Sequence, residues 1–391
     1  MHILRAPYLL YPVLFLGLVF LLDKVFLIPE VRDNFIQPGG MLYYRQRDLQ
    51  INRLHNALPE LPADRRVAVV FGDSRSFAIG DMTNVPLLEE GPDFRSWIIY
   101  NFAGPQAVPA YHTYLAERIF QGPQRPGYAI VGISPDAFNR RAGIFGSPVM
   151  TFGLSREFIE RYWSQVPAQD RATYTGSRRF ALTGMNFSFR GFWERLRGGW
   201  RGAAEDSSVV EGILLEANHD PASFARSMPL LRETFENAAT ASLDLYSLEH
   251  SPQRKLLDLA RGAQYLWFGR RTDQELEQET TRLVNFYIKN FTVSQEQFFF
   301  FELMLERLQR SGVRVVVFWP RVNAHLQAAY EDEPQIQSVW RRIEQLTARY
   351  GARAINLNTH PDMRCSDFYD ASHLSVHCFP DVQRILLRAL R

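Results

Sequence analysis

Three residues of the chain have the side chains that nucleophilic acyl chemistry requires. Ser74 lies in the segment Gly-Asp-Ser-Arg, residues 72–75, directly after the apolar run 67–71. Far along the chain, His373 follows Asp370 by three residues. On one loop, this spacing lets the carboxylate hold the imidazole in the tautomer that a general base needs. A serine nucleophile, a base and an orienting carboxylate predict chemistry at an acyl group.

Neither segment is specific by itself. Gly-Asp-Ser is a common turn and helix cap, which explains it without any chemistry. The two segments, however, stand at opposite ends of one α/β pattern. At a strand-to-helix turn, the free amides and the positive end of the helix would favour a developing negative charge. Together the segments favour a serine acyl enzyme.

Short apolar segments predict the framework that positions these residues. Five buried strands are expected at residues 67–71, 97–102, 128–133, 313–319 and 354–357. Helical patterns occur at residues 107–120, 295–310, 336–350 and 380–390. Apolar strands that alternate with helices predict an α/β fold, in which a parallel sheet carries helices on both faces.

The strand and helix pattern is interrupted over residues 140–279. This segment contains aromatic residues, arginine and glycine without the alternation of a strand. Because it is too long for a structureless loop, we expect a large, mostly helical insertion that could cover the site. The catalytic domain would then comprise residues 66–391, interrupted by this insertion.

The amino-terminal region is apolar enough to suggest a membrane segment. Residues 8–22 carry no charge and are followed by Asp23 and Lys24. About 20 residues are needed to cross a bilayer, so residues 8–28 would just suffice. The competing interpretation is a cleaved signal peptide, but no small-x-small cleavage site follows the run. We therefore expect an N-terminal transmembrane helix.

This expectation has consequences for location. Residues 1–29 would be an uncleaved signal anchor, and residues 30–65 would be a connector. Arg5 before the span places the amino terminus in the cytoplasm by the positive-inside tendency. The predicted protein is therefore a single-pass protein of a bacterial cytoplasmic membrane, with its catalytic domain outside the cytoplasm.

The chain has two cysteines, Cys365 and Cys378, and they bracket Asp370 and His373. Oxidising conditions outside the membrane would allow a disulfide between them. Such a bond would hold the loop that carries the base. The alternative is a pair of unrelated buried thiols.

The histidines permit a competing interpretation as a metal site. His373 and His377 have the i, i+4 spacing of zinc ligands on a helix, and His360, Cys365 and Cys378 lie nearby. A zinc ion bound by His373 would leave the serine segment unexplained. We therefore expect no metal and no cofactor. The formal net charge of +2 likewise gives no reason to expect a nucleic-acid partner.

The arrangement resembles the SGNH (GDSL-type) hydrolase superfamily. Residues 72–74 match its serine segment, with Arg75 at the position of the name-giving leucine, and Asp370 and His373 match its closing Asp-x-x-His. Gly104 matches the glycine whose amide joins the serine amide in the oxyanion hole. The resemblance implies a three-layer α/β/α domain, and it covers residues 66–140 and 294–391.

One segment departs from the family pattern. After the third predicted strand the family has Gly-x-Asn-Asp, whereas this chain has Gly-Ile-Ser-Pro-Asp. Asp136 has the wrong charge to stabilise an oxyanion, so Ser134 or Asn139 would have to replace the family's asparagine. Loss of one oxyanion donor typically costs about 3 kcal/mol in the barrier.

Membrane-anchored members of this superfamily resemble partners of membrane-bound O-acyltransferases. The resemblance thus implies an acyl-serine enzyme that transfers or removes O-acyl groups on a cell-envelope polysaccharide. A carboxylesterase or lipase-like hydrolase and an inactive scaffold subunit are the alternatives. Arg75 and Arg321 are candidates for substrate binding, and the expected partners are an acylated glycan or another ester, an O-acyltransferase and the membrane.

Overall fold

The computed structural model describes most of the predicted sheet domain and part of what surrounds it. The described residues are 10–32, 35, 50–52, 54–80, 87, 92–104, 106–141, 153–185, 187, 189, 192–193 and 271–391. Residues 194–270 of the predicted insertion and residues 36–49 of the predicted connector lie outside them.

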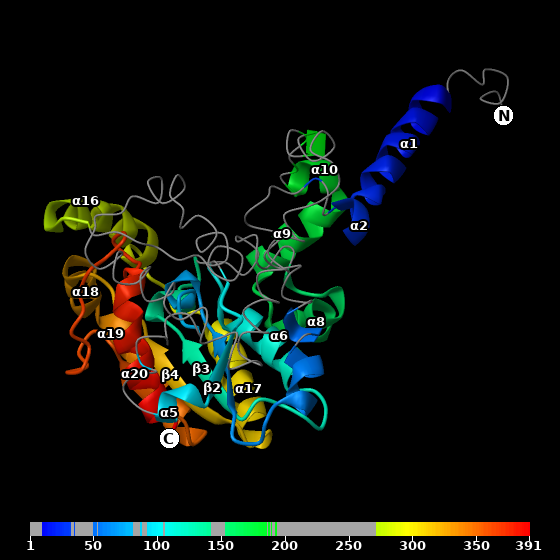
Figure 1. The fold of residues 1–391 in the computed structure, drawn as a ribbon. Helices are drawn as coiled ribbons and strands as arrows, with labels where there is room; N and C mark the ends of the chain where they lie inside the picture. The colour runs from blue at the N-terminus through cyan, green and yellow to red at the C-terminus, as the bar shows by residue number, and fades with distance from the viewer. Residues whose placement is uncertain are drawn as a thin grey trace.

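A five-stranded parallel sheet forms the centre of the domain, as predicted (Figure 1). Its strands are β1 (Arg66–Phe71), β2 (Trp97–Asn101), β3 (Tyr128–Gly132), β4 (Arg314–Trp319) and β5 (Arg353–Asn356). They lie in the order β2-β1-β3-β4-β5, and every neighbouring pair is parallel. Parallel strands end at one edge of a sheet, so the segments after β1, β2, β3 and β4 meet at a common edge.

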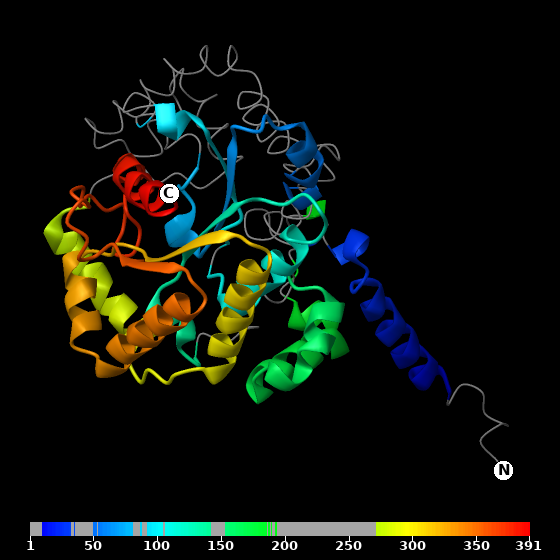
Figure 2. The ribbon, with the colours of Figure 1, turned by 90° about the horizontal axis from the view of Figure 1, so that it is seen from below.

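Helices cover both faces of the sheet, because successive side chains of each strand point to opposite sides. In β1, Val67, Val69 and Phe71 face one apolar core, while Ala68 and Val70 face the other. Helices α6, α17, α18 and α19 pack on the first face, and α20 packs on the second (Figure 2). Their bounds are α6 (Pro109–Ile119), α17 (Gln295–Arg310), α18 (Ala324–Glu331), α19 (Pro334–Arg349) and α20 (Phe379–Ala389).

Shorter elements surround these layers. They are α1 (Tyr11–Val25), α2 (Pro29–Arg32), η3 (Leu58–Glu60), η4 (Ser74–Ser76), α5 (Pro92–Arg95), η6 (Pro135–Phe138), α8 (Arg156–Arg161), η8 (Trp163–Gln165), α9 (Ala168–Arg179), α10 (Ala181–Gly184), α16 (Asp273–Leu283), the π-helix η9 (Val284–Ile288) and η10 (Val376–Cys378).

The end of the predicted connector packs with the domain core. Ile51 and Leu54 are buried in the same apolar core as α6. Beside them, the Gln50 side chain donates a hydrogen bond to the carbonyl of Asn101 at 3.0 Å. Packing therefore begins before residue 66, the boundary expected from the first strand. An i, i+3 apolar pair within a polar segment is too short a pattern to reveal such burial.

The charged pair of α1 contacts the α9–α10 junction. The Asp23 carboxylate accepts hydrogen bonds from the amides of Ala181 and Leu182 at 3.0 and 2.9 Å. The Lys24 ammonium donates to the carbonyls of the last two residues of α9 at 3.0 and 2.5 Å. Helix ends have amides and carbonyls without intrahelical partners. The pair therefore satisfies the end of α9 and the start of α10 together (Figure 1).

The helix α1 covers most of the predicted membrane segment and is 15 residues long. Among the helices of the described residues, none is both long enough and apolar enough to cross a membrane.

Two glycines let Ser76 pack beneath the serine turn. A Cβ atom at Gly72 or at Gly132 would overlap the Ser76 hydroxyl oxygen, and at Gly132 it would also lie 2.8 Å from Cζ of Phe318. Ser76 is fully buried, so its side chain has nowhere to move. Glycine at these two positions therefore leaves room for the Ser76 side chain next to the ends of β1 and β3.

We expect Gly132→Ala to destabilise the protein by about 1–3 kcal/mol, because the added methyl group overpacks a closed site. Gly127→Ala is the matched control, since a Cβ there has open space and the change should stay within about 0.5 kcal/mol. Urea unfolding at equilibrium measures both. Equal stability of the two variants would contradict the packing argument.

Candidate active site

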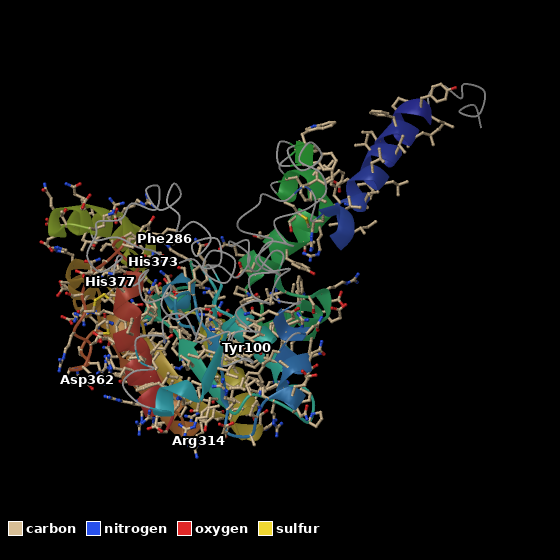
Figure 3. The ribbon with its side chains drawn as sticks, in the orientation of Figure 1. Tyr100, Phe286, Arg314, Asp362, His373 and His377 are labelled. Carbon is tan, nitrogen blue, oxygen red and sulfur yellow. A yellow bond between two sulfur atoms is a disulfide. The ribbon has the colours of Figure 1, made fainter. Side chains whose placement is uncertain are left out.

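The fold brings Ser74 and His373 into contact from segments 299 residues apart. Ser74 follows β1 at the carboxyl edge of the sheet, and His373 lies on the loop that precedes η10 (Figure 3). The Ser74 hydroxyl oxygen is 2.8 Å from Nε2 of His373. A nucleophile and a base are expected at this separation.

Asp370 holds the other side of the imidazole ring. Nδ1 of His373 is 2.7 and 2.9 Å from the two carboxylate oxygens. The carboxylate also accepts hydrogen bonds from the amides of Ser372 and His373. Because an ionised carboxylate accepts but cannot donate, the ring proton belongs on Nδ1, and the lone pair of Nε2 faces Ser74.

The surroundings of Asp370 favour its charged form. Burial alone would raise the pKa of this carboxyl, but the hydrogen bond and charge of His373 and the two backbone amides hold it below its usual value. The group is therefore ionised at neutral pH.

The loop that carries both residues is closed at several points. Within the loop, Phe368 forms an antiparallel bridge with Leu374. From outside, the Asn323 side chain donates to the carbonyl of Ala371, and Glu279 accepts the Ala371 amide at 2.9 Å. Asn323 is the N-cap of α18, and Glu279 belongs to α16. Two helices thus set the position of the loop.

The predicted disulfide is present at the foot of this loop. Cys365 and Cys378 are bonded, with their Cα atoms 5.2 Å apart. The bond encloses both Asp370 and His373.

The turn that carries Ser74 differs from the expected helix start. It is a single 3-10 turn, Ser74–Ser76, in which the Asp73 carboxylate accepts the Arg75 amide at 2.9 Å. The partial charge at the end of an α-helix comes from several aligned peptide groups. One turn supplies little of it, so the electrostatic contribution expected from a helix start is small.

Arg75 is buried in an ion pair instead of facing a substrate. Its guanidinium donates two hydrogen bonds to the Asp136 carboxylate, at 3.1 and 2.7 Å, and both side chains are almost fully buried. Tyr330 donates to the same carboxylate at 3.0 Å, and the Ser134 hydroxyl also donates to it. Asp136 is therefore the partner of Arg75. From the sequence it was noted only for a charge that is unsuited to stabilising an oxyanion.

These contacts oppose the desolvation that burial imposes. Burial would raise the pKa of Asp136, but Arg75 and the two hydroxyl donors lower it below its usual value. Asp73 shows the reverse balance: burial and the nearby Asp136 raise its pKa despite the attraction of Arg75. The pKa values of these two neighbouring carboxyls are therefore shifted in opposite directions.

The additional oxyanion donors proposed from sequence are bonded to other groups. The Gly104 amide donates to the carbonyl of Gly72 at 2.9 Å and extends the pairing of β1 with β2. The Ser134 hydroxyl is used by Asp136, and the Asn139 side-chain amide donates to the carbonyl of Tyr287 at 3.0 Å. Of the predicted set, the backbone amide of Ser74 has no acceptor among the described residues.

Arg321 also has an internal role. Its guanidinium donates to the carbonyls of Leu357 and Met363 at 3.4 and 3.3 Å, and the side chain is half-buried. It joins the end of β4 to the segment after β5.

Two aromatic residues of η9 were not anticipated from sequence. The Arg75 guanidinium lies 5.5 Å from the ring centroid of Tyr287. Phe286 is exposed, and its ring centroid lies 4.9 Å from that of Tyr287. Figure 3 shows Phe286 on the same side of the molecule as His373. Single π-turns occur frequently at functional sites. No local pattern in residues 284–288 separates this turn from the preceding helix.

The residues of the metal alternative do not gather around His373. A separate group comprises Cys365, Asp367, His377 and Cys378, whose donor atoms all lie within 4.8 Å of one another. Here Nε2 of His377 is 2.7 Å from the Asp367 carboxylate. His373 contacts Ser74 instead, so the two predicted histidine ligands serve different neighbours.

Comparison with known proteins places the chain in a family. The model of the family described as "Protein of unknown function (DUF1574)" matches residues 3–390, so the chain belongs to this family. A search of curated proteins found no match.

We expect Asp136→Asn to destabilise the protein by about 3–5 kcal/mol, because it leaves the Arg75 charge buried without a counterion. Glu160→Gln is the matched control: it breaks an exposed ion pair with Arg156 and should leave stability essentially unchanged. Chemical denaturation compares the two variants with the wild type. Comparable stability of all three would show that the buried pair does not support the fold.

Proposed function

We propose that this chain is a membrane-anchored serine acyl enzyme of the SGNH type, acting outside the cytoplasm on O-acyl groups of a cell-envelope polysaccharide. The observation that carries the proposal is the hydrogen-bonded series Ser74–His373–Asp370. Its distances are those of a nucleophile, a base and an orienting carboxylate. The five-stranded parallel sheet with helices on both faces agrees with such a domain.

In the proposed reaction, Nε2 of His373 accepts the Ser74 proton while the serine oxygen attacks the ester carbonyl. Asp370 stabilises the imidazolium that forms. The tetrahedral intermediate then expels the alcohol, which takes the proton back from His373, and an acyl-serine remains. A water molecule or a sugar hydroxyl attacks this acyl group, with His373 again accepting the proton, and free Ser74 is regenerated.

The Arg75–Asp136 pair would act as a positioning device in this reaction. It ties the residue after the nucleophile to the segment after β3. Since positioning errors of about 1 Å can cost 10²-fold in rate, a rigid serine turn is valuable for acyl transfer.

The oxyanion hole favours slow chemistry or a different acyl acceptor. Of the predicted donors, the Ser74 amide alone lacks another acceptor among the described residues. A missing donor typically costs about 3 kcal/mol in the barrier. Slow attack by water would leave time for a sugar hydroxyl to resolve the acyl-serine, which suits a transferase working with a membrane-bound O-acyltransferase. A carboxylesterase that forms free acid is the alternative within the enzyme class.

A second candidate function is an inactive scaffold subunit of an envelope acylation complex. It is favoured because three predicted oxyanion donors are hydrogen-bonded to other groups of the protein. Gly104, Ser134 and Asn139 all have internal partners. A scaffold would need none of the three for catalysis. Reactivity of Ser74 separates the two functions.

The membrane anchor is proposed from the apolar surface of α1. Most of its large apolar side chains are exposed, and they point in all directions around the helix; examples are Leu14, Phe15, Leu16 and Leu18. A helix that is apolar on every side favours a lipid environment. The disulfide agrees with an oxidising compartment.

A fluorophosphonate probe should label Ser74 covalently, because the probe reacts with serines that a neighbouring histidine activates. Ser74→Ala should abolish labelling, and Asp370→Asn should slow it by about 10⁴-fold through the wrong imidazole tautomer. Gel fluorescence and intact mass measure the adduct.

One variant serves as a control for this labelling. Asp273→Asn changes a surface aspartate that pairs with His325. It should label like the wild type. A folded wild-type protein that remains unlabelled would exclude the acyl enzyme and favour the scaffold.

The anchor predicts binding to vesicles of phosphatidylethanolamine and phosphatidylglycerol. We expect the wild type to float with these vesicles, and the double variant Leu14→Lys, Leu18→Lys to float at least about tenfold less, because lysine is costly in lipid. Phe286→Lys, an equally exposed apolar position outside α1, is the control and should float like the wild type. The anchor is wrong if the α1 variant floats as well as the control.

A further inference from the structure

We propose that the reduced form of the chain binds one Zn²⁺ ion through Cys365, Asp367, His377 and Cys378, at the place that the disulfide occupies in the oxidised form. The inference is independent of the proposed acyl chemistry. It also departs from the expectation that the chain holds no metal.

The four side chains form a donor set that suits zinc. Two thiolates, an imidazole and a carboxylate are ligands of tetrahedral zinc sites, whereas magnesium and calcium prefer oxygen alone. The donor atoms already lie within 4.8 Å of one another. Zinc–ligand bonds of about 2.0–2.3 Å place ligand atoms roughly 3.3–3.8 Å apart in a tetrahedron. Once the sulfur–sulfur bond is broken, small side-chain rotations bring the four donors to these separations.

Backbone contacts hold the donors independently of the disulfide. The Cys365 amide donates to the Asp381 carboxylate at 3.1 Å, and the Cys378 amide donates to the carbonyl of Ser375 at 3.0 Å. The amide of Ser375 in turn donates to the carbonyl of Asp367 at 2.9 Å. These hydrogen bonds do not involve the disulfide, so they would still hold the backbone at both cysteines after reduction.

The environment further favours metal binding. Cys378 is 1% exposed, and the His377 side chain is also almost buried. The pairing of His377 with Asp367 already brings an imidazole nitrogen and a carboxylate oxygen within 2.7 Å of each other. Zinc would take both atoms as ligands.

A dithiol can convert the oxidised form into the reduced form by thiol–disulfide exchange. Two electrons and two protons pass from the dithiol to the disulfide, which gives the thiols of Cys365 and Cys378 and an oxidised dithiol. Zinc then displaces the two thiol protons, while the neutral imidazole of His377 binds through Nε2 with its single ring proton on Nδ1. Oxidation by a disulfide reverses the electron transfer and releases the ion.

Both forms would close the same loop. The disulfide and the zinc site each join residue 365 to residue 378 around Asp370 and His373. The consequence is that this loop stays closed under reducing conditions whenever zinc is present. Zinc would therefore stabilise the reduced chain and leave the oxidised chain unaffected.

Zinc content of the full-length chain tests the proposal. The protein is reduced anaerobically with dithiothreitol, desalted, incubated with Zn²⁺ and passed through a second gel-filtration column before elemental analysis. We expect about one zinc ion per reduced chain and none on the chain whose disulfide is intact. His377→Ala should lose the retained zinc, whereas His360→Ala, which changes a histidine of the same region outside the cluster, should keep it.

Two further measurements distinguish lost ligation from lost folding. Circular dichroism of the oxidised His377→Ala variant reports whether the fold survives. Cobalt in place of zinc should give a thiolate charge-transfer band with the reduced wild type, and this measurement needs no variant. Absence of retained zinc and of the cobalt band on the reduced wild type would overturn the proposal, as would equal zinc retention by a folded His377→Ala variant.

Discussion

The buried ion pair between Arg75 and Asp136 is the interaction on which the site depends. Removing two charges from water is costly, and the cost is offset only by close geometry and complete hydrogen bonding. Here two guanidinium hydrogen bonds, Tyr330 and Ser134 supply that geometry. Because Arg75 follows Ser74 directly, the pair fixes the turn that carries Ser74 against the segment after β3. The same turn needs glycine on both strands to accommodate Ser76.

Helix α18 connects this ion pair to the histidine loop. Its N-cap Asn323 holds the carbonyl of Ala371, and Tyr330 near its other end donates to Asp136. One rigid element therefore contacts both halves of the candidate site. This explains how Ser74 and His373 reach hydrogen-bond distance although the chain between them is long. The covalent link at Cys365 and Cys378 closes the loop from its other side.

Strong internal bonding distinguishes this site from an open oxyanion hole. The groups that could stabilise an oxyanion mostly satisfy their own surroundings, as Gly104 does with the carbonyl of Gly72. A buried polar group without a hydrogen-bond partner is costly, so in a stable fold most buried donors and acceptors are hydrogen-bonded. Hydrogen-bond donors near Ser74 that could face an oxyanion instead bond to the protein and hold their surroundings in place.

The sequence by itself determined the parallel sheet, because its apolar runs are long enough to be buried on both faces, and it located α17 and the cysteine pair. Local spacing within two segments also singled out Ser74, Asp370 and His373, and the fold brings these side chains within hydrogen-bond distance. Tertiary structure alone decided the role of Arg75, since its partner Asp136 lies 61 residues away and is reached only because β1 pairs with β3. The helix expected at Ser74 became one 3-10 turn, and Arg321 turned to loop carbonyls. In each case the outcome depended on which polar group the side chain meets in the folded protein. The order of the strands determines these neighbours, and local sequence spacing does not.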